Sequence, residues 1–210
     1  MQNKLSRKLS EDSCFLGHGV SDHKYALSPP LSEDDVSLIE KENGINLPKE
    51  YREFVINIGD GGAGPSYGLY SLHVALTDHG SMHLDGSIKE DFLQPEKLHD
   101  DKSNESGLLV ICEHGCAHAD YLVVNGSARG QIWQYVDGGG FLPAPRKRVR
   151  IDYSNCTTIQ DRTAKNREHY ETLLKLEEND IHTFNTWYEA WLDQPVQFPV
   201  KPKKWYQFWR

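Results

Sequence analysis

The sequence LSEDDVSLIEKENGINLPKEYREFVINIGDGGAGPSYGLYSL, residues 31–72, carries the clearest signals for the fold of this chain. Ser32 is a favourable helix N-cap, and Asp35 stands three residues later, where an acid can complete a capping box. Gly44 suits the left-handed conformation that commonly ends a helix. Pro48 then suits the start of a second helix, because its missing N–H costs nothing there. We therefore predict two short, consecutive helices.

The second of these helices has one apolar face and leads into a glycine-rich loop. Its apolar residues recur at the i, i+3, i+4 and i+7 spacing of an amphipathic helix, at Tyr51, Phe54, Val55 and Ile58. The following run DGGAGP, residues 60–65, cannot form regular structure. It differs from a phosphate-binding loop, because it follows a helix instead of entering one and lacks the motif's lysine. We expect a structural turn, followed by a strand that begins near Tyr67 and Leu69.

The middle of the sequence predicts an antiparallel sheet. Short connections separate three apolar runs, which we predict as strands at residues 108–112, 121–124 and 131–136. Consecutive strands joined by short turns pair in the antiparallel sense. We also expect a further strand around Val149 and Ile151, and a short helix before the sheet, over residues 88–93.

Two helices are expected near the C-terminus. Tyr170, Leu173 and Leu174 mark the apolar face of the first. The second has large apolar residues at i, i+3, i+4, i+7 and i+8, namely Phe184, Trp187, Tyr188, Trp191 and Leu192. Helices at both ends of a central antiparallel sheet, of about 4–6 strands, give an α+β fold. We expect the tryptophans at 133, 187 and 191 to lie in its core.

We divide the chain into an N-terminal extension at residues 1–30, a domain at residues 31–194 and a C-terminal tail at residues 195–210. The extension has few apolar residues, so we expect it to be only partly ordered. The tail places four aromatic residues beside basic ones, at Trp205, Tyr206, Phe208 and Trp209. Such a tail suits a flap or edge strand docked on the domain, which we favour, or else a membrane interface or a partner groove.

The composition is that of a globular protein and argues against several functional classes. The chain has 31 acidic and 23 basic residues, and its formal charge of −8 disfavours direct binding to nucleic acid. We find no apolar run long enough to cross a membrane, no secretory signal and no disulfide framework among four scattered cysteines. We therefore expect a cytoplasmic protein whose charge serves either solubility or a basic protein partner.

The segment CEHGCAH, residues 112–118, contains four potential zinc ligands: Cys112, His114, Cys116 and His118. If extended, these seven residues would span about 20 Å at ~3.3 Å each, too far to surround one ion. A tight turn at Gly115 could gather two or three of them. We favour a hairpin with the cysteines inside and the histidines near the turn, and we predict no metal and no cofactor.

No catalytic motif is evident in the sequence. It contains neither G-x-S-x-G nor H-E-x-x-H, and adjacent carboxylates such as Asp34 and Asp35 are typical of solvated faces. We therefore expect no enzymatic activity. A zinc-dependent or thiol-based enzyme is the interpretation that we favour least.

The capped acidic helix, GINLPKEYREFV (residues 44–55), the glycine-rich loop and YGLYSL (67–72), in this order, resemble the SUKH superfamily. Two later segments fit the same family, GLLVICEHGCAHADYLVVNGSARGQIWQYV (107–136) and FNTWYEAWLD (184–193). The resemblance implies an immunity protein that binds and occludes a cognate bacterial toxin, in many systems a nuclease, without catalysis. Some members are instead regulatory or scaffold modules, which is the alternative function. A toxin gene beside this one would favour immunity.

We expect the partner-binding surface to join the glycine-rich loop to the turn of the hairpin near residues 113–117. Loops at the end of a rigid sheet commonly carry residues that bind partners. The candidate partner-binding residues are Asp60, Gly61, Gly62, Tyr67, Glu113 and His114. The expected partner is a basic toxin, which the acidic chain would attract.

Overall fold

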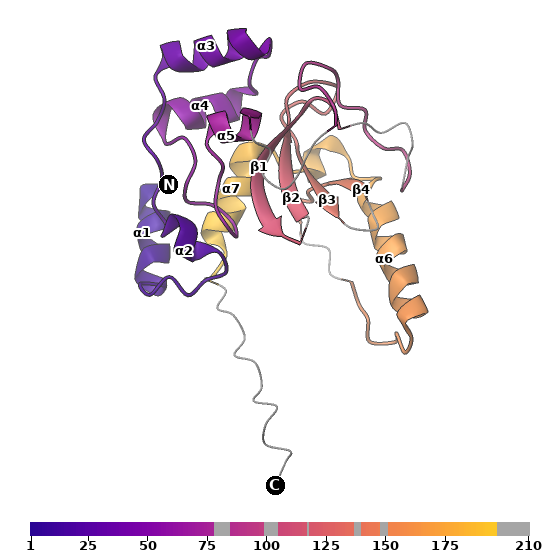
Figure 1. The fold of residues 1–210 in the computed structure, drawn as a ribbon. Coiled ribbons are helices and arrows are strands. Elements are labelled where there is room, and N and C mark those ends of the chain that lie inside the picture. The colour runs from indigo at the N-terminus through magenta and orange to yellow at the C-terminus, as the bar shows by residue number, and fades with distance from the viewer. Residues whose placement is uncertain (78–84, 99–104, 117, 137–139, 148–150, 197–210) are drawn as a thin grey trace.

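The computed structural model describes residues 1–77, 85–98, 105–116, 118–136, 140–147 and 151–196. Five helices precede the sheet: α1 (Gln2–Glu11), α2 (Val20–His23), α3 (Glu33–Asn43), α4 (Lys49–Asn57) and α5 (Leu72–Thr77). The strands are β1 (Leu108–Gly115), β2 (His118–Val123), β3 (Ile132–Val136) and β4 (Gly140–Pro143). Helix α6 (Ile159–Leu173), a 3-10 turn (Glu178–Asp180) and α7 (Phe184–Asp193) follow. The predicted α+β fold is confirmed (Figure 1).

Helices α3 and α4 begin and end where the sequence predicts. The hydroxyl of Ser32 accepts a hydrogen bond from the backbone N–H of Asp35, and the Asp35 carboxylate accepts one from the N–H of Ser32. Gly44 ends α3 with a φ of 63°, and Pro48 immediately precedes α4. Arg52 on α4 then pairs with Glu33 on α3 at 2.6 Å. The two helices are therefore defined by local signals and joined by an ion pair.

The glycine-rich loop packs against its own chain on both sides. Gly62 has a φ of +97°, and a methyl group there would lie 2.4 Å from the carbonyl oxygen of Ala26. Only glycine fits such a position. The strand predicted near Tyr67 is reduced to isolated bridges that join Leu69 to Gly62 and to Cys112, and α5 begins immediately afterwards.

The sheet is a meander with the order β1-β2-β3-β4, and all neighbouring strands are antiparallel. The three predicted strands are confirmed, whereas β4 was not predicted because glycines obscure its start. The predicted helix over residues 88–93 is wrong: residues 88–90 form a turn, and the N–H of Phe92 bonds instead to Asn125 at 3.1 Å. Of the further predicted strand, Val149 lies outside the described residues and Ile151 belongs to no strand.

A β-bulge in β1 decides which side chains face α7. Val110 pairs with Tyr121, but the next pair is Cys112 with Asp120, so Ile111 is an additional residue on β1. Bulges re-aim the side chains that follow them. Ile111 and Cys112 consequently belong to the same core cluster, although they are adjacent in sequence.

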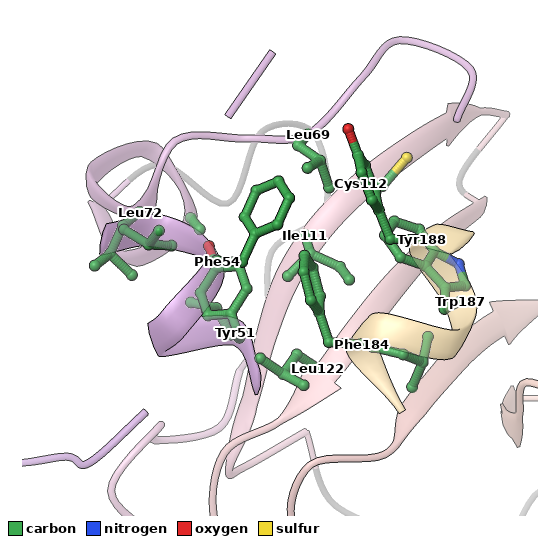
Figure 2. Packing of buried hydrophobic residues seen from close by; sticks show 14 of the residues in the cluster. Tyr51, Phe54, Leu69, Leu72, Ile111, Cys112, Leu122, Phe184, Trp187 and Tyr188 are labelled. Carbon is green, nitrogen blue, oxygen red and sulfur yellow. The ribbon is translucent and has the colours of Figure 1, made fainter. Parts of the chain in front are cut away.

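The main core lies between the sheet and helices α4 and α7 (Figure 2). The ring of Phe184 lies 5.0 Å from both Tyr51 and Phe54, and the hydroxyl of Tyr188 donates to the carbonyl of Ala63 at 2.9 Å. The predicted apolar face of α7 is confirmed for four of its five residues, which are buried: Phe184, Trp187, Tyr188 and Leu192. A second cluster on the opposite face of the sheet contains Phe92, Trp133 and Phe141.

Trp191, which was predicted in the core, is only partly buried. It packs against the main core cluster, and α1 lies over its ring. The ammonium group of Lys8 lies 4.9 Å from the centre of its ring. Lys8 also donates to the carbonyl oxygen of Gln194, and Lys4 pairs with Asp193 at 2.9 Å. Helix α1 therefore docks at the C-terminal end of α7 (Figure 1).

Further contacts join residues 1–30 to the glycine-rich loop. The carboxylate of Asp12 is buried and accepts hydrogen bonds from the backbone of Leu16 and Gly17. The contact with the loop itself is made by the N–H of Ala63, which donates to the carbonyl oxygen of Ala26 at 2.8 Å.

Of the predicted tail, residues 197–210 lie outside the described residues. Within the described part of the chain, no helix is long and apolar enough to cross a membrane.

Candidate functional site

The structure places the glycine-rich loop beside the hairpin formed by β1 and β2. The hydroxyl of Ser66 lies 2.8 Å from Nδ1 of His114. A methyl group added to Gly115 would lie 3.4 Å from the ring of Tyr67. The end of the loop and the turn of the hairpin thus form one surface, which we call the loop–hairpin surface and define as Ser66, Tyr67, Glu113 and His114.

The candidate partner-binding residues differ in exposure. Tyr67 is 42 % exposed, and its ring lies 5.2 Å from that of His18 in an edge-to-face arrangement. Glu113 and His114 are half-buried, and the carboxylate of Glu113 accepts a hydrogen bond from Tyr70 at 2.7 Å. An aromatic ring at the surface and a carboxylate fixed in place are groups that a protein partner can contact.

The glycine-rich end of the same loop lies inside the protein. Asp60 is only 9 % exposed, Gly61 is buried and Gly62 is half-buried. The Asp60 carboxylate accepts a hydrogen bond from the N–H of Leu72 at 2.7 Å, at the start of α5. Burial raises the pKa of Asp60, while this backbone hydrogen bond acts in the opposite direction. These residues hold the loop from within.

Asp120 belongs to the candidate site and is not among the residues predicted from the sequence. It is 1 % exposed, and Oδ2 accepts a hydrogen bond from the indole of Trp187 at 3.0 Å and lies 2.8 Å from Nε2 of His114. Its other oxygen accepts from Gln134 at 2.7 Å. The available signal was a lone acid within the apolar run ADYLVV, residues 119–124. A buried carboxylate there needs several donors.

The environment of Asp120 shifts two neighbouring titratable groups. Burial lowers the pKa of His114, but the hydrogen bond and charge of Asp120, with the charge of Glu113, raise it more, so that the net shift is upward. Burial raises the pKa of the Cys112 thiol, and the same two carboxylates add to that effect. The thiol donates to the carbonyl oxygen of Pro65 at 3.2 Å. A protonated thiol is a poor nucleophile, which argues against a thiol-based enzyme.

The polar network borders a cavity of about 580 Å³. The cavity lies between residues of the N-terminal segment, the loop, the sheet, α6 and α7. Its walls include Lys8 and His18, His114 and Asp120 from the hairpin, and Trp187 and Trp191 from α7. It is therefore lined by both aromatic and titratable side chains.

The four potential zinc ligands of the sequence are not brought together. Cys112 is buried as predicted, but Cys116 is exposed, because it lies in the turn with a φ of +53°. His118 starts β2, paired with Gly115. Among the described residues, the group that could hold a metal ion is Cys112, His114 and Asp120, whose ligand atoms all lie within 4.8 Å of one another.

Comparison with known proteins identifies the family. Among curated proteins, none matches this chain. The family model of SMI1 / KNR4 (SUKH-1) matches residues 30–150, which is more than half of the chain. The match runs from the start of the capped helix α3 past β4 and includes the loop–hairpin surface. This chain therefore belongs to the SMI1 / KNR4 family (SUKH-1).

Proposed function

We propose that this protein is an immunity protein, which binds a cognate bacterial toxin and occludes it without catalysis. Membership of the SUKH-1 family supports this class of function. The observation that carries the proposal is the loop–hairpin surface, where an exposed tyrosine of the loop lies beside a carboxylate fixed on strand β1. The partner is a basic toxin of the nuclease class, and the complex has one copy of each protein.

Tyr67 is the central contact in this proposal. Tyrosine is enriched among the residues that dominate binding energy, because it contributes a large apolar area at a low cost in side-chain entropy. The ring contacts that of His18 edge-to-face and lies near Gly115, where an added methyl group would be 3.4 Å from it. Such support reduces the entropy that Tyr67 loses when a partner binds.

Glu113 supplies the acidic component of the surface. Its carboxylate is held by the hydroxyl of Tyr70, so the charge has a fixed position at the edge of the sheet. The whole chain carries a formal charge of −8, which attracts a basic protein from a distance. Asp60, Gly61 and Gly62 contribute by holding the loop in place, because the first two are buried.

We further propose that the encounter takes place in the cytoplasm. All four cysteines are free, including the buried Cys112. Free thiols are typical of proteins that remain in a reducing compartment.

The test is co-expression with the toxin encoded by the neighbouring gene, with cell survival and one-to-one co-purification as the readouts. Tyr67→Ala should weaken binding by about tenfold or more, as expected for a central aromatic contact. Tyr153→Ala is the matched control, because Tyr153 is 40 % exposed, close to the 42 % of Tyr67, and lies just before α6. Both variants should melt near the temperature of the parent protein.

Three results would contradict the proposal. Equal binding by the two variants would remove the loop–hairpin surface from the interface. Protection of cells by far less than one copy per toxin would indicate an enzyme that destroys the toxin. Failure to bind any neighbouring gene product would favour the regulatory or scaffold module instead.

A further inference from the structure

Three side chains of different chemistry converge on one face of the β1–β2 hairpin. Cys112 and Asp120 lie directly opposite each other in the strand register, and His114 follows two residues after Cys112. The bulge at Ile111 turns Cys112 toward the α7 side of the sheet, and a second irregularity in the pairing lies at His114, whose Nε2 is 2.8 Å from Asp120. Their ligand atoms all lie within 4.8 Å of one another.

These distances are close to those of a tetrahedral zinc site. Zinc binds sulfur at about 2.3 Å and nitrogen or oxygen at about 2.0–2.2 Å, so its ligand atoms lie roughly 3.3–3.8 Å apart. Nε2 of His114 is now 2.8 Å from Oδ2 of Asp120. An ion that replaced this hydrogen bond would increase the distance between the two atoms by about 1 Å or less. Small side-chain movements can supply such an increase.

We propose that Cys112 Sγ, His114 Nε2 and one carboxylate oxygen of Asp120 bind a zinc ion. A water molecule from the adjoining cavity completes the tetrahedron, because His114 and Asp120 line the wall of that cavity. A thiolate favours zinc over magnesium or calcium, which prefer oxygen ligands. This site shares Ser66 and His114 with the loop–hairpin surface, and it requires no catalytic step.

Two of the three ligands, His114 and Asp120, have partners that orient them, as in protein zinc sites generally. The hydroxyl of Ser66 lies 2.8 Å from Nδ1 of His114, and this contact leaves Nε2 for the metal. Gln134 donates to Oδ1 of Asp120, and Trp187 donates to Oδ2. These three supporting residues come from different parts of the chain: Ser66 from the loop, Gln134 from β3 and Trp187 from α7.

The charges balance when the ion binds. The Cys112 thiol, which now donates to Pro65, releases its proton and forms a sulfur–zinc bond. Neutral His114 carries its proton on Nδ1 and donates it to Ser66, while Nε2 binds the metal. One thiolate and one carboxylate offset the two positive charges of zinc, so the buried site is neutral overall.

This zinc site differs from the one that the sequence motif suggests. Asp120 replaces Cys116 and His118 as a ligand, since Cys116 is exposed in the turn and His118 is outside the converging group. The proposal also departs from the expectation, drawn from the motif alone, that no metal is bound. Cys116 and His118 consequently provide matched controls, a cysteine and a histidine four residues from Cys112 and His114.

Cobalt substitution of the full chain tests the proposal. The protein is stripped of metal with a chelator, titrated with Co²⁺ and followed by absorbance, with zinc then added to displace the cobalt. We expect one equivalent of cobalt to produce a thiolate-to-cobalt charge-transfer band that zinc abolishes. Cys112→Ser should lose the band, and Cys116→Ser should retain it at full intensity.

A second pair of variants covers the case in which Cys112→Ser fails to fold. His114→Gln should lose at least tenfold in zinc affinity, because one of three protein ligands is gone. His118→Gln should bind as the parent protein does, and circular dichroism confirms that both are folded. A cobalt spectrum without the thiolate band, less than half an equivalent bound, or a band lost in Cys116→Ser but not in Cys112→Ser would overturn the proposal.

Discussion

The indole N–H of Trp187 donates to Oδ2 of Asp120 at 3.0 Å, so α7 is fastened to β2 by a hydrogen bond inside the core. Asp120→Ala should therefore destabilise the protein by roughly 3 kcal/mol or more in urea unfolding with chelator present. Trp187 would lose its acceptor inside the core, where an unsatisfied buried donor costs about 1–3 kcal/mol. The half-buried Gln134 and His114 would lose theirs as well. Asp34→Ala, at an exposed position on α3, is the control and should change stability by less than ~1 kcal/mol.

Gly62→Ala should destabilise the protein far more than Gly140→Ala. Both glycines have a positive φ, of +97° and +77°, so both substitutions strain the backbone. Only at Gly62 would the methyl group approach the carbonyl of Ala26, at 2.4 Å, whereas nothing lies within 4 Å at Gly140. The difference in unfolding free energy, roughly 2 kcal/mol or more, measures the crowding between the loop and the N-terminal segment. Equal effects would show that this contact opens readily.

Trp191→Ala should cost about 1–3 kcal/mol, less than the roughly 3–5 kcal/mol of a fully buried tryptophan. Trp191 is only partly buried, and part of its contribution depends on Lys8 above the ring. A double-mutant cycle with Lys8→Met should give a coupling of about 0.5–2 kcal/mol, the range of cation–π contacts. Purely additive effects would contradict the interaction.

The contribution of His114 to stability should decrease as the pH rises. Its pKa is higher in the folded protein than the ordinary value of 6.5, so protonation favours the folded state. That stabilisation is complete below about pH 6.5 and is lost as the pH rises through the folded-state pKa. In metal-free buffer, the difference in unfolding free energy between the parent protein and His114→Gln should therefore shrink as the pH rises above about 6.5. A difference that grew with pH would contradict the interaction with Asp120.

Removal of the charge at Glu113 should slow toxin association at low salt. Glu113→Gln keeps an acceptor for Tyr70, so stability should change little. The association rate should fall a few-fold, and the effect should vanish at high salt, since screening acts over a Debye length of ~8 Å at physiological ionic strength. Glu42→Gln, on the exposed side of α3, provides the control and should leave the rate near that of the parent. Stopped-flow measurements at several salt concentrations would separate the two.

Local signals in the sequence predicted the elements that depend on few neighbours. The Ser32–Asp35 capping box and Gly44 define α3, and the spacing of aromatic residues identifies α7. These features act over one or two helical turns, which a sequence window covers. Pairing partners were also predictable for strands joined by short turns.

The remaining features depend on contacts between distant parts of the chain. Helix α5 begins where Asp60, twelve residues earlier, accepts the N–H of Leu72. The position of Cys112 depends on the bulge at Ile111, which no local propensity predicts. Asp120 immediately precedes the strand predicted at residues 121–124, and its place in the core depends on Trp187, far along the chain, which donates to it. The candidate site is therefore mostly a product of tertiary structure.

The docking of α1 on α7 joins two helices that lie near opposite ends of the described residues. Arg7 donates to the carbonyl of Leu192 across 185 residues of sequence, and Lys8 to that of Gln194 across 186. A nascent chain that ends before α7 lacks the surface on which α1 docks. Helix α1 must therefore wait until α7 has been synthesised, at about 5–20 residues per second, before its partner is available. Docking of α1 on α7 then becomes a late event of folding, which follows the synthesis of the residues between them.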